Sequence, residues 1–141
     1  WYNNLINSGC TVEILGSELS VTTLWFGGTC DLLIRINGKV YIVDFKTSNH
    51  ISANYFIQLG RYKYLIEREL NIMIDGGFIV LQLNKEEPGY DEYILLADDR
   101  AHSYFIENCV VTFLSLAYGY YHVTECINQF NTIFDTKGGY V

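Results

Sequence analysis

Two aspartates and one lysine are the residues whose types and spacing best suit chemistry. Asp31 and Asp44 lie on either side of Asn37-Gly38, the dipeptide that most strongly signals a type I′ hairpin turn. If those two residues form the loop, Asp31 stands directly opposite Asp44 on the neighbouring strand, with Cβ atoms about 5 Å apart. Lys46 follows Asp44 by two residues, so the period-2 pleat of a strand places its ammonium on the same face.

Two opposed carboxylates need compensation, because like charges directly opposite each other destabilise a sheet. The flanking runs 32–34 and 41–43 are apolar and are typical of strands covered on both faces, where charged residues are rare. A bound cation or a shared proton would compensate for the repulsion. The alternative is that both strands end in solvent, with Asp44 and Lys46 as an ordinary surface ion pair. Hairpin geometry alone leaves both interpretations open.

The composition indicates a globular protein. The chain has 141 residues, of which 50% are hydrophobic and 18% charged, enough to bury a sizeable core, and we expect residues 1–141 to form a single domain. The formal net charge of −7 argues against a protein that coats nucleic acid non-specifically. It does not exclude a nuclease, since metal ions and a local cluster of Lys and Arg can offset the field at one cleft.

We expect no membrane span and no disulfide framework. The longest apolar run, residues 109–121, contains Thr112, Ser115 and Gly119 and is too short to span a bilayer. No secretory or transit segment is apparent, so we expect a cytoplasmic protein. The cysteines are widely spaced, without a C-x-x-C pair, and are typical of intracellular free thiols: Cys10, Cys30, Cys109 and Cys126.

The order of the predicted elements is helix, three strands, helix, two strands, helix. This order predicts an α/β fold with a mixed β-sheet of about five strands flanked by helices. The expected ranges are a helix end over 1–8, one long or two short strands over 11–23, the hairpin around Asn37-Gly38, a helix over 53–70, strands over 78–83 and 92–96, and a helical region from 100 to about 134 that could break near Gly119.

The helix over 53–70 carries polar residues that could belong to the site. Gln58 and Tyr62 are four residues apart and therefore neighbours on the helix surface. With Arg61 beside them, they face either the carboxylate end of the hairpin or solvent. Gly60 lies in the apolar stripe of this helix, where the absence of a side chain would let the helix approach the sheet closely.

Glu18 is the other acidic residue that could join the aspartates. It shares the strand over 11–23 with Glu13, and an odd spacing turns the two side chains to opposite faces of a regular strand. A bulge at Gly16 would change that. For Glu13 we favour an exposed strand position without a role in the site.

Three motifs together resemble the PD-(D/E)XK nuclease superfamily. They are Gly28-x-x-Asp31, Asp44-Phe45-Lys46-Thr47-Ser48 and Gln58-x-x-x-Tyr62. The sequence looks most like the RecB-type branch, which includes phage, bacterial and mitochondrial exonucleases. The match covers residues 18–62, roughly a third of the chain, and it implies a restriction-endonuclease-like core.

The resemblance also implies roles for the residues of the first two motifs. Asp31 and Asp44 would bind Mg²⁺ or Mn²⁺, together with the backbone carbonyl of Phe45. Lys46 would orient the attacking water and neutralise charge on the phosphorane. Glu18 lies where many relatives carry an acidic residue ahead of Gly-x-x-Asp. The metal role of Asp31 and Asp44 agrees with the geometry of the hairpin, which brings their carboxylates together, because hard oxygen ligands suit these ions.

Residues after the metal motif would contact the substrate. Gln58 and Tyr62 match the family's helix motif, which supports the site and contacts DNA. Thr47, directly after Lys46, and Arg61, directly before Tyr62, are the other candidate substrate-binding residues. RecB-type members also carry a metal-binding His or Glu on an upstream helix, for which residues 1–10 offer no counterpart. Either that residue belongs to a piece ahead of Trp1, or Glu18 replaces it.

The expected function is hydrolysis of DNA phosphodiester bonds by a metal-dependent nuclease. We expect an exonuclease acting in phage or bacterial replication, recombination or repair, with a helicase or recombination protein as partner. Two alternatives are a catalytically inactive module that binds DNA or a protein, and an RNA endonuclease on the same fold. Some related nucleases hold an iron–sulfur cluster on clustered cysteines, a spacing that Cys109 and Cys126 do not reproduce, so we expect no cluster.

Overall fold

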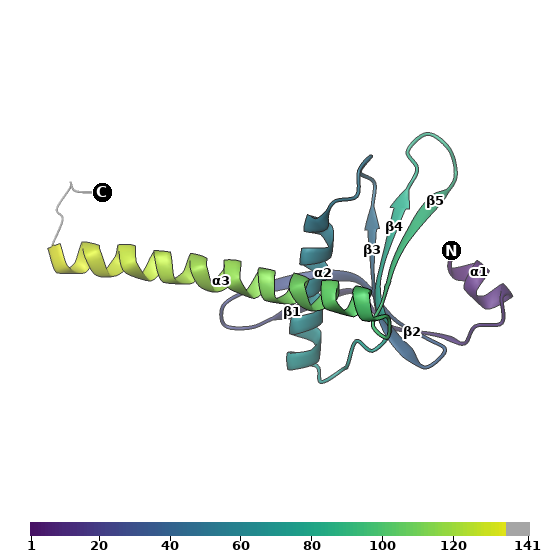
Figure 1. The fold of residues 1–141 in the computed structure, drawn as a ribbon, viewed down its shortest axis with the longest axis horizontal. Helices are drawn as coiled ribbons and strands as arrows, with labels where there is room; N and C mark the ends of the chain where they lie inside the picture. The colour runs from purple at the N-terminus through teal and green to yellow at the C-terminus, as the bar shows by residue number, and fades with distance from the viewer. Residues whose placement is uncertain (135–141) are drawn as a thin grey trace.

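Helices and strands follow one another in the order that the sequence predicts (Figure 1). The computed structural model describes residues 1–134, and within that range the chain forms an α/β fold with three helices and one five-stranded sheet. The elements are α1 (Tyr2–Asn7), β1 (Val12–Thr22), β2 (Gly27–Ile36), β3 (Lys39–Lys46), α2 (Ala53–Glu69), β4 (Gly77–Leu83), β5 (Tyr90–Leu96) and α3 (Arg100–Phe134).

The sheet is open and mixed, as predicted. Its strands lie in the order β1-β2-β3-β4-β5. All neighbours are antiparallel except β3 and β4, which are parallel. A parallel pair needs a long crossover connection, and α2 provides it. The residues over 11–23 form one long strand, and its register shifts between Ile14 and Gly16, which is the bulge that Gly16 suggested.

The hairpin between β2 and β3 has the predicted register. Its pairs run from Ile36 opposite Lys39 to Leu32 opposite Val43. The loop residues Asn37 and Gly38 have φ of 48° and 83°. Two successive positive φ values are what a type I′ turn requires, so the turn residues themselves account for the register.

The central strands are covered on both faces. On the helix side, Leu33 and Ile42 are 0% exposed and pack with α2 and α3. On the other side, a smaller cluster contains Leu32, Ile34 and Val43, against which Trp1 packs. The hydroxyl of Tyr90 on β5 accepts a hydrogen bond from Asn4 Nδ2 at 2.9 Å, which holds α1 beside that strand. Charged groups on these strands can therefore reach water only at the strand ends.

Gly60 lies against α3, and the expectation that it lets α2 approach the sheet is wrong. A Cβ atom at Gly60 would come within 2.7 Å of the backbone carbon of Cys109 and 2.8 Å of the nitrogen of Val110. Nearby, the rings of Phe56 and Phe105 have centroids 5.8 Å apart. The missing side chain therefore sets how closely the two helices cross.

The last helix is longer than a sheet-packing helix needs to be. α3 runs without a break from Arg100 to Phe134, through Gly119, and at 1.5 Å per residue it is about 52 Å long. The expected break is absent because a helix interior tolerates a single Gly at a cost of only about 1 kcal/mol. Its first half packs on α2, and its distal half extends away from the sheet (Figure 1). No helix within residues 1–134 is both long and apolar enough to cross a membrane.

We predict that Gly60→Ala destabilises the fold by about 1–3 kcal/mol, because the new methyl group would press on the α3 backbone. Urea unfolding measures this change. Gly119→Ala is the matched control: a Cβ there meets nothing within 4 Å, so the substitution should be neutral or increase helix stability. If Gly60→Ala unfolds at the same urea concentration as the wild type, the two helices do not cross this closely.

Candidate functional site

Asp31, Asp44 and Lys46 meet where β3 ends. The regular pairing of β2 and β3 stops at Leu32 and Val43, one position before the two aspartates. There the Phe45 backbone N–H donates a hydrogen bond to Asp31 Oδ2 at 2.9 Å. The Asp31 side chain thus extends the contact between the strands, and it holds its carboxylate next to Asp44.

Asp44 is buried, so the surface ion pair considered above does not describe it. Its exposed fraction is 4%, and it is the single buried charged residue in the described part of the chain. Asp44 Oδ2 has no hydrogen-bond donor within residues 1–134. The ammonium of Lys46 lies 2.9 Å from this oxygen, at ion-pair distance without the alignment of a hydrogen bond. Lys46 is thus the cation already beside this oxygen, whose lone pairs no well-aligned hydrogen bond from the described residues uses.

The protonation of Asp44 reflects its surroundings. Burial, which disfavours the charged form, raises the pKa of Asp44 to about 6. The ammonium of Lys46 opposes this rise, and the neighbouring Asp31 carboxylate adds to it. Asp44 is therefore largely ionised at neutral pH, and it takes up a proton under mildly acidic conditions.

Lys46 is held between β3 and the first turns of α2. Besides its contact with Asp44, its Nζ donates a hydrogen bond to Gln58 Oε1 at 3.3 Å. The same ammonium lies 4.7 Å from the centroid of the Tyr55 ring, a cation–π distance. Gln58 thus joins the site through Lys46. Tyr55 was missed from the sequence, although its position three residues before Gln58 places both on one helix face.

Tyr62 is a core residue as much as a site residue. Its exposed fraction is 8%, and it belongs to the cluster between the sheet and the helices. Its hydroxyl accepts a hydrogen bond from Arg61 Nη2 at 3.2 Å. A Cβ at Gly28 would lie 2.7 Å from the Tyr62 ring. The missing side chain of this glycine, the first residue of Gly28-x-x-Asp31, therefore lets α2 pack closely against β2.

Arg61 carries an unused donor above the same glycine. Its Nε is buried and makes no hydrogen bond within the described residues. Its guanidinium carbon lies 5.0 Å from the Tyr62 ring centroid and 5.7 Å from that of Phe113. Planar aromatic contacts of this kind hold a guanidinium in place while its charge stays available to an anion.

Glu18 does not join the two aspartates. Its neighbours pair as Ser17 with Leu32 and Leu19 with Cys30, which places Glu18 level with Asp31. However, its φ is 49°, so the strand does not alternate normally there, and the residue is exposed. In residues 1–134, no group of three or more His, Cys, Asp and Glu side chains is arranged to hold a metal ion.

Two further residues of the predicted set lie at the rim. Phe45 gives its N–H to Asp31 and exposes its side chain, and its carbonyl as a metal ligand stays a prediction. Thr47 follows directly after β3 and is exposed. Burial raises the pKa of the Cys30 thiol to about 12, and the nearby charges of Asp31 and Asp44 add to this rise. This thiol therefore stays protonated at neutral pH in the chain without a metal ion.

The donor set of the site fits a hard divalent ion. Mg²⁺ is commonly bound by only one or two carboxylates and keeps several waters, with substrate phosphates completing its shell. Asp31 and Asp44 offer two carboxylates of this kind, and one of their oxygens is buried without a hydrogen bond. These two aspartates would hold the ion, and water would supply the positions that no third acidic side chain fills.

Titration of Asp44 should make stability depend on pH in a specific direction. Between roughly pH 4 and pH 6 the folded chain binds this proton more tightly than the unfolded chain, so its contribution to the unfolding free energy falls as pH rises and stays low above pH 6. Asp44→Asn removes this contribution. In urea unfolding without divalent ions, we expect a smaller loss of stability between about pH 4.5 and about pH 7.5 than in the wild type.

Asp98→Asn is the matched control for that experiment. Asp98 is exposed, and its hydrogen bond with Lys39 lowers its pKa, so its contribution to stability changes with pH in the opposite direction. The Asp98 variant should keep the loss of stability that the wild type shows. An Asp44→Asn variant that keeps it too would identify another group as the one that titrates.

Substitutions at Tyr62 separate packing from substrate contact. Removing the buried ring in Tyr62→Ala should cost about 3–5 kcal/mol of unfolding free energy. Tyr62→Phe should cost only about 0.5–1.5 kcal/mol, because it loses one partly buried hydrogen bond. Urea unfolding measures both values. Wild-type stability in Tyr62→Ala would instead indicate a ring that is free to stack on a nucleotide base.

Comparison with known proteins adds no relative to this geometry. No model of a known protein family matches the sequence, and neither does any curated protein. A functional assignment for the chain therefore depends on the chemistry of Asp31, Asp44, Lys46 and the residues of α2 that surround them.

Proposed function

We propose that this protein is a metal-dependent nuclease of the PD-(D/E)XK type that hydrolyses DNA phosphodiester bonds. The observation that carries the proposal is the buried Asp44 carboxylate, which lies beside Asp31 and 2.9 Å from the ammonium of Lys46. Lys46 supplies one positive charge to two neighbouring carboxylates, so one negative charge stays without a partner within residues 1–134, and a divalent ion held by both carboxylates would neutralise it.

The proposed chemistry assigns a different task to each residue. Asp31 and Asp44 would hold the ion, which would supply Lewis-acid chemistry for activating a water and stabilising the leaving oxygen. Lys46 carries the positive charge that stabilises the phosphorane, and its contacts with Gln58 and Tyr55 keep the ammonium in place. Because the pKa of Asp44 is raised to about 6, the ion binds best above that pH, when the carboxylate is ionised.

The residues around the site are compatible with a nucleic-acid substrate. Arg61 brings positive charge above Gly28, three residues before Asp31, and guanidinium groups bind phosphate through paired hydrogen bonds. Its Nε is buried, so a phosphate would meet the Nη atoms. Beyond the ends of β3 and β4 lies a hollow of about 460 Å³, lined by Asn49, Asn84, Lys85, Glu86 and Glu87. None of the proposed site residues lines it, and its two glutamates would repel a phosphate. In α/β sheets, ligands commonly bind beyond the carboxyl ends of parallel strands. We propose that the scissile phosphate lies at the end of β3, beside Asp31, Asp44 and Lys46.

The arrangement of the sheet supports a restriction-endonuclease-like core. β1, β2 and β3 form an antiparallel meander, and α2 connects β3 to its parallel neighbour β4. The three proposed site residues belong to the two central strands of this unit. Such a core with acidic residues on its second and third strands is what the motif resemblance implies.

A non-catalytic module that binds DNA or a protein is the second candidate. Two observations favour it: Glu18 does not join the aspartates to form a larger metal group, and the net charge is −7. The choice between DNA and RNA, and between ends and internal sites, depends on the substrate path rather than on the metal pair. The same assay can separate these possibilities.

We predict cleavage of end-labelled linear DNA in Mn²⁺ or Mg²⁺, with little attack on circular DNA if the enzyme acts at ends. Lys46→Ala should reduce cleavage by about 100- to 1,000-fold, as the loss of one transition-state stabiliser does. Metal should still raise the melting temperature of this variant, because Lys46 is not a ligand. Asp44→Ala should lose both cleavage and the metal response.

Lys39→Ala is the matched control, since Lys39 begins the same strand but pairs with Asp98 far from the site in sequence. It should cleave like the wild type. Equal cleavage by the Lys46 and Lys39 variants would remove Lys46 from the reaction. A metal response without cleavage of DNA or RNA would favour the non-catalytic module.

A further inference from the structure

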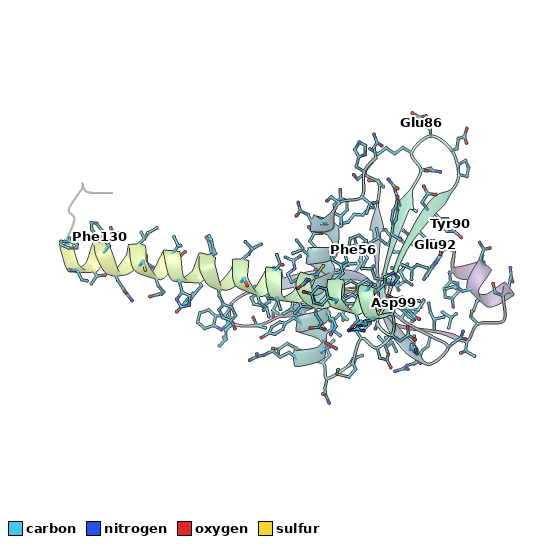
Figure 2. The ribbon with its side chains drawn as sticks, viewed as in Figure 1. Phe56, Glu86, Tyr90, Glu92, Asp99 and Phe130 are labelled. Carbon is cyan, nitrogen blue, oxygen red and sulfur yellow. The ribbon has the colours of Figure 1, made fainter. Side chains whose placement is uncertain are left out.

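The distal half of α3 exposes an apolar stripe that the rest of the described chain leaves uncovered. The loop between β1 and β2 packs on one side of this helix, with Phe26 on Phe113 and Trp25 on Tyr121 at centroid distances of 5.0 and 4.4 Å. The stripe begins at the edge of this contact, where Tyr120 lines a hollow together with Trp25 and Phe26, and runs on along the helix beyond the loop. Figure 2 shows Phe130 near the far end of α3, well away from the sheet.

The spacing of the stripe is that of a coiled coil. Its positions alternate by four and three residues, which is the a/d pattern of a heptad repeat. We call these six residues the α3 seam: Leu116, Tyr120, Val123, Ile127, Phe130 and Phe134. All six are between 39% and 78% exposed, and the rings of Phe130 and Phe134 lie 4.7 Å apart along the seam. A single helix cannot bury such a seam by itself.

We infer that the α3 seam pairs with the α3 seam of a second copy of this chain. With aromatic side chains burying about 150–250 Å² each, the seam exposes on the order of 600 Å² per copy. Two seams together then approach the roughly 1,200 Å² at the lower end of specific interfaces. The area therefore suits a self-pairing helix, and its small size indicates a dimer that depends on concentration.

The charges of the helix favour a second copy over other occupants. Residues 101–134 contain no Lys or Arg, and residues 111–134 contain Glu125 as their single acidic residue. Helices that lie on membranes are rich in Lys and Arg on the polar face, and binding to nucleic acid requires the same residues. Two copies of a nearly neutral seam meet without repulsion between like charges.

The positions beside the seam allow close approach. Ala117, Thr124 and Asn131 occupy the e positions, of which the first two lie beside Trp25 and Phe26 of the β1–β2 loop. Gly119, Cys126 and Ile133 occupy the g positions. Most of these side chains are small, so the backbones of two helices can come near and let a and d side chains interlock. The inference does not depend on nuclease activity, because the seam lies outside the candidate active site.

Sedimentation equilibrium of the whole chain tests the pairing over a roughly hundredfold range of protein concentration. We expect the mass to rise from monomer to dimer. Ile127→Asp places a charge at the centre of the seam and should weaken the dimer by about 30-fold or more, as loss of a central interface residue does. Asn128→Asp introduces the same charge one residue later, at an exposed position off the seam, and should dimerise like the wild type.

Far-UV circular dichroism of each variant shows whether the helix is intact, and Val123→Asp provides a second seam variant if Ile127→Asp does not fold. A wild-type chain that stays monomeric over the whole range would overturn the inference, whether or not it binds lipid vesicles. So would a dimer that Ile127→Asp and Val123→Asp leave unchanged, because another surface would then form it.

Discussion

Burial of the Asp44 carboxylate is the constraint on which the candidate site depends. Removing a charged carboxylate from water costs several kcal/mol unless another charge and hydrogen bonds compensate. Lys46 supplies the charge from 2.9 Å, while Asp31 turns its own carboxylate toward the Phe45 N–H. The balance is incomplete, since Asp44 has a raised pKa of about 6 and an oxygen without a hydrogen bond. A site of this kind readily accepts a proton or a cation.

Helix α2 supports this balance by fixing the position of Lys46. Its first turns bring Gln58 and Tyr55 to the Lys46 ammonium. Its middle places Tyr62 in the core and Gly60 against the α3 backbone. Side chains on a helix that is packed on both a sheet and another helix have little freedom to move. Such support is what holds a reactive group in a productive geometry.

Much of the fold could be predicted because its signals are local. Asn37-Gly38 specifies the turn, the turn specifies the register, and the register brings Asp31 to Asp44. Lys46 follows from the pleat alone. The long helix beyond residue 100 was also predicted, but its continuity through Gly119 was not. Glycine signals only a preference, which the surrounding helical residues outweighed.

By itself, the sequence determined the order of the elements, the hairpin register and the pair of aspartates, since each depends on residues close together in the chain. Only the tertiary structure decided that Asp44 is buried, that Gly60 meets Cys109 rather than the sheet, and that Glu18 stays apart. Those outcomes depend on which surfaces pack against each other across long distances in sequence. A local pattern cannot contain that information, because burial is a property of the neighbours that folding brings together.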